Sequence, residues 1–157
     1  MRFRIRDATA GDAESVGELV KEFQAYLRAL GDQTAFAFTA AMYLRDGFGP
    51  HPAFSGIVAE VDGVVAGYLL YHFGYDTDCG VRLLHVIDLY VKAASRRAGI
   101  GGALMRAAAE ICGNAGGGAL IWSVFVHNNL AFQFYERLGA ERIQDLEFMR
   151  WAVPTMD

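Results

Sequence analysis

Arg96-Arg97-Ala98-Gly99-Ile100-Gly101-Gly102 is the most informative segment of this chain. It follows an apolar run, residues 86–91, and precedes a helical pattern of apolar side chains. Glycines let the backbone turn sharply and approach a ligand closely. The helix that follows begins with unpaired N–H groups and the positive end of its dipole. A strand, a basic glycine turn and a helix N-terminus together predict a site for pyrophosphate.

The spacing of the glycines distinguishes between kinds of phosphate ligand. A P-loop requires a Lys-Ser or Lys-Thr pair after its last glycine, and the chain has neither pair. The dinucleotide fingerprint requires a third glycine, where this chain has Leu104. The sequence therefore argues against a nucleotide oxidoreductase. The pattern that fits is Arg-x-x-Gly-x-Gly, formed by Arg96, Gly99 and Gly101.

That pattern resembles the acetyl-CoA pyrophosphate loop of the GCN5-related N-acetyltransferases, the GNAT family. Residues 128–140, Asn-Asn-Leu-Ala-Phe-Gln-Phe-Tyr-Glu-Arg-Leu-Gly-Ala, are similar to the second signature of the family, Asn-x-x-Ala-x-x-Phe-Tyr followed by Leu-Gly. Residues 5–13 resemble its opening strand and first helix, so the similarity spans nearly the whole chain. Residues 84–91, with 68–73 before them, look most like the diamine and polyamine acetyltransferase branch.

The length and the hydrophobic periodicity predict a single α/β domain, residues 1–157. Strands are expected at 2–7, 55–61, 64–73, 81–92, 119–126 and 142–153, and helices at 10–30, 34–45, 99–113 and 128–139. Asp62-Gly63 predicts a tight hairpin between the second and third strands. The resemblance implies a three-layer fold whose mixed, largely antiparallel sheet splays between the fourth and fifth strands.

Composition narrows the classes of function further. The net charge of −4 argues against a general nucleic-acid surface. The longest apolar run, residues 63–71, is far shorter than the ~20 residues of a membrane span. No signal peptide is recognisable, and the chain has only two cysteines, which we interpret as reduced. We therefore expect a cytoplasmic protein.

The residues expected to hold acetyl-CoA follow from the turn and from the resemblance. Backbone N–H groups of the turn should bind the pyrophosphate, with two arginines adding positive charge. The preceding strand should pair with the pantetheine amides, and Asn128 should either contact CoA or cap its helix. The predicted cofactor-binding residues are Leu89, Tyr90, Val91, Arg96, Arg97, Ala98, Gly99, Ile100, Gly101, Gly102 and Asn128.

Three residues are candidates for catalysis. Tyr135 matches the signature tyrosine whose role in the family is to protonate the departing thiolate, and the alternative is core packing. Asp88 interrupts an apolar strand, either bonded to backbone at a bulge or orienting the amine and relaying its proton through water. An exposed Asp of pKa ~3.9 is too weak a base to act alone. His85 is the second candidate for that task.

We therefore expect an acetyl-CoA-dependent N-acetyltransferase in which a small primary amine attacks the thioester directly. The branch carries an acidic pair in this strand, but here Ile87 replaces its first member, which leaves smaller or singly charged amines open. A protein or peptide amine and a non-catalytic CoA-binding regulatory domain are the alternatives. No histidines or cysteines have metal-ligand spacing, so no metal is expected. A homodimer is usual in the resembling branch.

Overall fold

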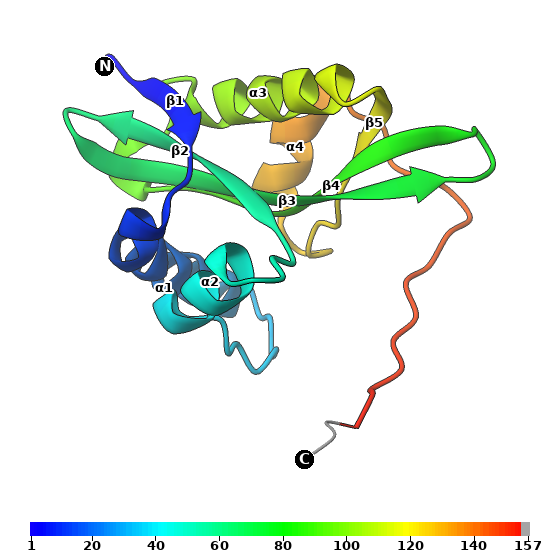
Figure 1. The fold of residues 1–157 in the computed structure, drawn as a ribbon, viewed down its shortest axis with the longest axis horizontal. Coiled ribbons are helices and arrows are strands. Elements are labelled where there is room, and N and C mark those ends of the chain that lie inside the picture. Colours follow the sequence, from blue (N-terminus) through cyan, green and yellow to red (C-terminus); the bar gives the residue numbers. More distant parts are fainter. Residues whose placement is uncertain (155–157) are drawn as a thin grey trace.

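A five-stranded sheet in the order β1-β2-β3-β4-β5 forms the centre of the protein. It is seen in a computed structural model that describes residues 1–154 (Figure 1). The first four strands pair antiparallel, and β5 pairs parallel with β4. The strands are β1 (Arg4–Asp7), β2 (Ser55–Val61), β3 (Val64–Asp76), β4 (Val81–Val91) and β5 (Gly117–Ile121). The predicted mixed, largely antiparallel sheet is confirmed.

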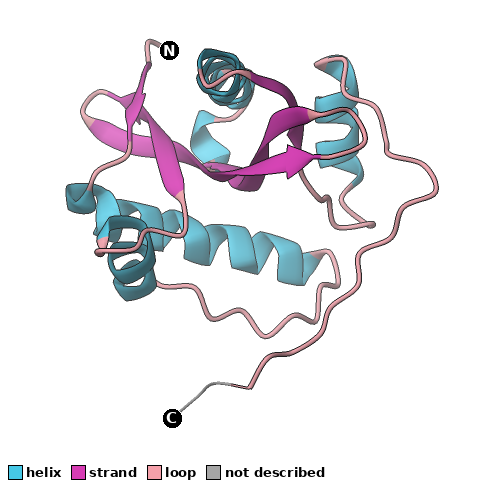
Figure 2. Cartoon of the chain, turned by 45° about the vertical axis from the view of Figure 1, so that its right-hand side comes forward, coloured by secondary structure: helices cyan, strands magenta, loops and turns pink. Residues whose placement is uncertain are grey.

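Helices cover both faces of this sheet and make three layers (Figures 1 and 2). One face carries α1 (Ala13–Ala29) and α2 (Ala40–Phe48), and the other carries α3 (Ile100–Asn114) with α4 (Asn129–Arg137) beside it. Two short 3-10 helices, Ala10–Asp12 and Ala93–Ser95, precede α1 and the glycine turn. Each face has its own core. Ile57, Leu69, Leu84 and Leu104 lie on the α3 side, and Val16, Val58 and Tyr68 lie on the α1 side.

The hairpin between β2 and β3 confirms the sequence signal. Asp62 and Gly63 both have positive φ, 49° and 81°, as a type I′ turn requires. The predicted bounds of the second helix, 34–45, are wrong at the start: α2 begins only at Ala40. The Thr39 side chain accepts a hydrogen bond from the N–H of Met42 and so fixes that start.

A β-bulge in β4 decides which side chains reach each face. Leu70 pairs with Asp88 and Tyr71 pairs with Val86, so Ile87 has no partner on β3. One extra residue reverses the alternation of side chains along the strand. Val86 therefore lies in the α3-side core. Asp88 lies on the α1 face together with its partner Leu70, and Tyr90, two residues further along β4, lies on the same face.

The last predicted strand, residues 142–153, is wrong. Residues 138–154 include no strand and run away from the body of the molecule (Figure 1). Phe148, Met149 and Trp151 are 82%, 98% and 93% exposed. Alternating apolar residues form a strand only when a neighbouring strand takes up their backbone hydrogen bonds, and this segment pairs with no described strand of its own chain.

Candidate active site

The sheet opens where β4 and β5 separate. Pairing between them covers only Arg82–His85 of β4, and β5 ends at Ile121 rather than at the predicted 126. The rest of β4 therefore has an edge without a strand partner on this side. A cavity of ≈ 320 Å³ lies at the opening. It is lined by Phe23, Leu27, Asp32, Val86, Ile87, Asp88, Leu89, Trp122, Ser123, Val124, Phe125, Asn128, Ala131 and Tyr135. We call this cavity the cleft.

The glycine turn lies between the end of β4 and the start of α3. Arg97 and Gly99 adopt positive φ, 64° and 85°, which turns the chain into the helix. The N–H of Ala103 is bonded to the Gly99 carbonyl, so the N–H groups just before it have no helical acceptor. At Gly101 an added Cβ would lie 3.1 Å from the Phe134 ring. A helix N-terminus with open N–H groups fits a pyrophosphate.

The exposed side chain of Arg96 contacts other parts of the protein. Its Nε donates to the Val91 carbonyl at 2.9 Å, and its guanidinium lies 5.1 Å from the ring centroids of both Tyr26 and Tyr90. The side chain thus holds the turn against α1 and the end of β4. Arg97 is exposed at the same turn.

Asn128 caps α4, which was one of the two roles expected for it beside a contact with CoA. Its Oδ1 accepts from the Ala131 N–H at 3.2 Å and from the Tyr26 hydroxyl at 2.8 Å. The second bond joins α1 to α4 across the cleft. Asn128 is 7% exposed and also lines the cavity, so capping does not remove it from the site.

Asp88 projects into the cleft among apolar and aromatic side chains. Burial raises the pKa of its carboxyl to about 6, and the Tyr68 hydroxyl lowers it in part. A carboxylate with this pKa is still mostly ionised at pH 7, but it is a stronger base than an exposed Asp of pKa ~3.9. The sequence argument assumed an exposed carboxylate, because burial behind the bulge is not visible in a single sequence.

Tyr135 lies on α4 at the other wall of the cleft. Its ring centroid is 4.8 Å from that of Trp122 and 4.9 Å from that of Phe134. Burial raises the pKa of its hydroxyl to about 12, and the charge of Asp88 adds to the shift. The hydroxyl therefore stays protonated, and it lies close enough to Asp88 for the two groups to influence each other.

His85 shares the α1 face with Asp88 but does not line the cleft. Its Nδ1 is 2.9 Å from Nε2 of His72, its cross-strand partner. Burial lowers the pKa of His85, and His72 adds to the effect. The structure thus brings Asp88 and Tyr135 together and leaves His85 at the rim.

Sequence reasoning missed several residues of the cleft. Phe23, Leu27 and Asp32 come from the end of α1 and the loop after it, and Trp122 follows β5. The Asp32 carboxylate accepts from the Thr34 N–H, and hydrogen bonding to Thr34 lowers its pKa. No motif marks these positions, since they meet only when α1 crosses the sheet.

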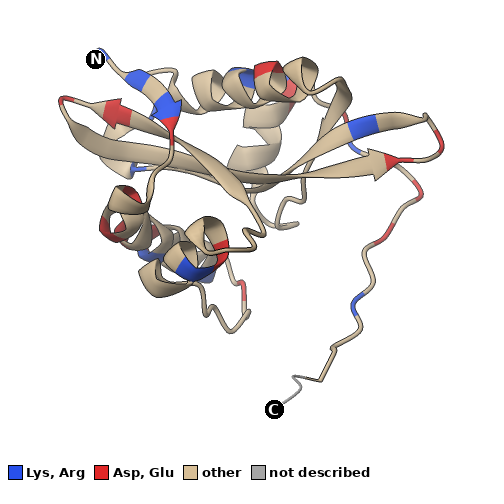
Figure 3. Ribbon diagram, viewed as in Figure 1, with Lys and Arg blue, Asp and Glu red and all other residues tan. Residues whose placement is uncertain are grey.

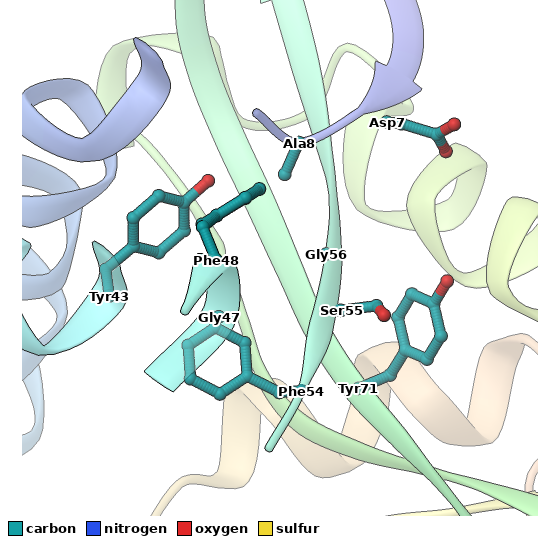
Figure 4. Close-up of a pocket in the computed structure, with 9 residues that line it drawn as sticks. All are labelled: Asp7, Ala8, Tyr43, Gly47, Phe48, Phe54, Ser55, Gly56 and Tyr71. Atoms are coloured by element: carbon teal, nitrogen blue, oxygen red, sulfur yellow. The ribbon is translucent and has the colours of Figure 1, made fainter. Parts of the chain in front are cut away.

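A second hollow, of ≈ 250 Å³, lies on the far side of the sheet from β5 (Figure 4). Tyr43, Phe48 and Phe54 enclose it between α2 and β2, and Asp7, Ser55 and Tyr71 lie on its other side. It contains none of the predicted site residues. Acidic and basic residues are scattered over the fold rather than gathered on one face (Figure 3).

Two further observations concern residues 1–154. Nowhere in this range do three or more His, Cys, Asp or Glu residues stand close enough together to hold a metal ion. Within the same range no helix is both long and apolar enough to cross a membrane.

Comparison with known proteins gives a consistent result. The model of the acetyltransferase (GNAT) family matches residues 18–140. The chain is 33% identical over 151 residues to the thialysine N-epsilon-acetyltransferase of Bos taurus, covering 91% of this chain and 86% of the bovine protein. It is 32% identical over 145 residues to the spermidine/spermine N(1)-acetyltransferase-like protein 1 of Homo sapiens, covering 88% of this chain but only 20% of the human protein.

Solved structures agree on the fold. An integron cassette protein from V. cholerae superposes with a TM-score of 0.79 at 25% identity, covering 98% of this chain and 94% of that one. The ribosomal-protein-alanine N-acetyltransferase of Brucella melitensis biovar Abortus 2308 superposes with a TM-score of 0.76 at 20% identity, covering 96% and 100%.

The open mixed α/β sheet with a glycine turn beside its splayed edge agrees with the fold of the solved acetyltransferase structure. The chain belongs to the GNAT family and is an N-acetyltransferase.

Proposed function

We propose that this enzyme transfers the acetyl group of acetyl-CoA to the primary amine of a small molecule, by direct attack within a ternary complex. The observation that carries the proposal is the cleft itself. Asp88 of β4 and Tyr135 of α4 both line this cleft, and the cleft lies beside the part of β4 that does not pair with β5. A buried base can take the proton of the amine, and a protonated phenol can give one to the leaving thiolate.

Binding of acetyl-CoA would use the turn and the edge. Backbone N–H groups of residues 98–102, with Arg97, would hold the pyrophosphate. Pantetheine amides would pair with Leu89, Tyr90 and Val91 along the edge that β5 leaves open. N–H groups on that edge would also polarise the thioester carbonyl. Bound acetyl-CoA supplies the activated acyl group.

Asp88 would take the proton of the acceptor ammonium, directly or through one water. An amine of pKa ~10.4 is almost fully protonated at pH 7. Raising the pKa of the base from 3.8 to about 6 makes the transfer easier by roughly two pKa units, or about a hundredfold. The neutral amine then forms the C–N bond, and the C–S bond breaks.

Tyr135 would give its proton to the departing thiolate. As the amide forms, the nitrogen loses its second proton, which restores the phenol. The balance is one ammonium ion and one thioester to one amide and one thiol, with one proton left on Asp88. No residue forms a covalent bond with the acetyl group in this scheme.

The acceptor would be a diamine, a polyamine or an amino-acid-like amine. Support comes from the two relatives, whose names specify thialysine and spermidine or spermine. Ile87, 40% exposed, offers no second charge in β4. Asp32 lines the same cleft and stays ionised, so it is available to a second cationic group. A peptide or protein amine is the competing acceptor.

The test is an acetyl-transfer screen with diamines, polyamines, amino acids and peptides, monitored by release of the CoA thiol. We expect turnover with small amines and a preference for those with a second cation. If peptides are turned over faster than all small amines, the acceptor class is wrong. If acetyl-CoA binds but no amine releases thiol, the chain is a CoA-binding domain without catalysis.

The proposal includes a cytoplasmic homodimer. Support for the dimer is the segment 141–154, whose apolar side chains are exposed in a single copy. Support for the compartment is that Cys79 and Cys112 are both unpaired. Light scattering on the full chain and on a chain ending at Ala140 tests the dimer. A monomeric full chain would contradict it.

A further inference from the structure

Tyr68 has a buried hydroxyl group that has no part in the proposed reaction. It lies on β3, in the α1-side core, and its side chain is 0% exposed. Among residues 1–154 its hydroxyl has no hydrogen-bond partner of normal geometry, and no other buried side-chain oxygen or nitrogen of these residues is in that position. Burying a hydroxyl without a partner costs about 1–3 kcal/mol, so its retention points to a use.

The carboxyl of Asp88 is close enough to this hydroxyl to interact with it. Leu70 pairs with Asp88 and Tyr68 pairs with Tyr90, so Tyr68 and Asp88 lie on one face of the sheet, in diagonal positions. The two groups affect each other: the Tyr68 hydroxyl lowers the pKa of Asp88, and the Asp88 charge raises the pKa of Tyr68 after the larger effect of burial. The donor is therefore in place although no bond of normal geometry is formed.

We propose that Tyr68 is a positioning residue that donates a hydrogen bond to the Asp88 carboxylate, fixes its orientation toward the acceptor amine and keeps it ionised. The inference rests on the proposed function, in which Asp88 is the base. A carboxylate in an apolar cleft becomes neutral unless a donor favours its charged form. Tyr68 is that donor, and it approaches from the neighbouring strand β3 on the same face of the sheet, which leaves the other carboxylate oxygen for the acceptor.

The other groups around Asp88 do not supply the same bond. Tyr135 on α4 faces it across the cleft, but its proton is reserved for the thiolate. The α1 residues at the cleft, Phe23 and Leu27, carry no charge. Asp32, after α1, is an anion and would disfavour a second charge. On β4 itself, Tyr90 approaches Glu22, its Oη 3.4 Å from Oε2, and His85 is bonded to His72.

The test compares Tyr68→Phe with Tyr43→Phe. Tyr43 is an equally buried tyrosine of the same core, 1% exposed, and its hydroxyl donates to the Thr9 carbonyl at 2.8 Å, far from the cleft. The Tyr43 change removes a bond and should lower the melting temperature. The Tyr68 change removes a buried hydroxyl that has no bond of normal geometry but also raises the cost of the ionised Asp88, so the melting temperature should fall less than in Tyr43→Phe.

The decisive measurement is the pKa of Asp88 in the enzyme without substrates, by NMR titration of the side-chain carboxyl carbons. The resonance is assigned by its loss in Asp88→Asn. We expect Tyr68→Phe to raise this pKa by about one unit, a tenfold change in the acid constant, and Tyr43→Phe to leave it unchanged. An unmoved pKa in Tyr68→Phe, or the same shift in both variants, overturns the proposal.

Kinetics then connects the shift to the reaction. The ratio of kcat/KM of Tyr68→Phe to that of the wild type cancels the titration of the amine itself. This ratio should be about fivefold lower at pH 6 than at pH 9, as a one-unit shift from about 6 requires. In an Asp88→Asn background the Tyr68 change should have no further effect. A ratio independent of pH overturns the positioning role.

These experiments distinguish a failure of the proposed function from a failure of the role assigned to Tyr68. A wild-type enzyme that releases no thiol with any amine refutes the proposed function and this inference with it. An active wild-type enzyme whose Asp88 pKa and pH profile do not respond to Tyr68→Phe refutes the inference alone.

Discussion

Replacing Asp88 by Asn should stabilise the protein while it removes activity. Burial raises the pKa of this carboxyl from 3.8 to about 6 in the folded state. A shift of roughly two units corresponds to about 3 kcal/mol that the ionised carboxylate costs the folded protein at neutral pH. An amide of the same shape carries no such cost. For a domain of this size, about 3 kcal/mol raises the melting temperature by roughly 5–10 °C.

The dependence on pH identifies the cause. Between pH 4 and 6 the folded protein retains a proton on Asp88 that the unfolded chain has released. The wild type therefore loses stability as the pH rises through this window. Asp88→Asn should match the wild type below about pH 4, exceed it increasingly up to pH 6, and keep a constant advantage above. Denaturant unfolding at pH 3.5, 5 and 7.5 measures this directly.

A matched control uses an exposed aspartate. Asp76 accepts N–H bonds from Asp78 and Cys79 at the tip of the β3–β4 hairpin, and the Cys79 bond leads in lowering its pKa. Asp76→Asn should therefore lower stability above pH 4, the opposite sign. Activity should fall about 10²-fold or more in Asp88→Asn and stay unchanged in Asp76→Asn. A stability difference for Asp88→Asn that is equal at pH 3.5 and 7.5 refutes the reasoning.

Three further variants test the rest of the molecule. Tyr135→Phe should lower kcat by about 10²-fold or more with little change in the KM for acetyl-CoA, and a kcat within about threefold of wild type would return Tyr135 to a packing role. Arg97→Ala should weaken acetyl-CoA binding by roughly 10- to 100-fold in calorimetry at unchanged melting temperature, since a charged hydrogen bond contributes about 1.5–3 kcal/mol. The carboxylate of Asp12 accepts two 2.8 Å bonds from Arg6, and the bonds to Arg6 lead in lowering its pKa to about 2. Asp12→Asn removes the negative charge and leaves only one acceptor oxygen for Arg6. It should cost about 1.5–3 kcal/mol in urea unfolding at pH 7, and the loss should disappear as the pH falls from 4 to 2.

Local signals in the sequence were sufficient for most elements of the fold. Asp62-Gly63 predicts its hairpin because positive φ at two successive positions suits few other residues. Asn128 predicts the start of α4 because its side chain can cap the helix whatever else surrounds it. Each of these signals acts within a few residues, so no knowledge of the tertiary structure is needed.

The errors arose where the outcome depends on distant parts of the chain. The periodicity of 34–45 suits a helix, but the first residues of this stretch form the connection between α1 and α2, and the helix begins only after Thr39 caps it. The segment 142–153 alternates like a strand, yet no described strand of its own chain pairs with it. In both places the local pattern is compatible with several structures, and the neighbours decide.

The candidate site divides in the same way. The glycine turn and Tyr135 stand in motifs and could be named from the sequence. The surroundings of Asp88 could not be predicted from the sequence. The bulge at Ile87 turns this side chain to the α1 face, where Tyr68 and the end of α1 enclose it. Arg96 matches its motif, but its guanidinium is packed between Tyr26 and Tyr90. Motifs marked the glycine turn and Tyr135, and packing determines which other residues line the cleft and what their proton affinities are.

The proton affinities of Asp88 and Tyr135 are coupled, and the coupling favours the order of the proposed steps. With its pKa at about 12, the Tyr135 hydroxyl is a weaker acid than a free thiol of pKa ~8.5, so giving a proton to the thiolate is uphill in the resting enzyme. Part of that high pKa comes from the charge on Asp88. Once Asp88 accepts the proton of the amine, that charge disappears, and the Tyr135 hydroxyl becomes a stronger acid than it is in the resting enzyme. The same apolar cleft raises the proton affinity of a thiolate that leaves within it. Deprotonation of the amine on one wall therefore prepares protonation of the leaving group on the other.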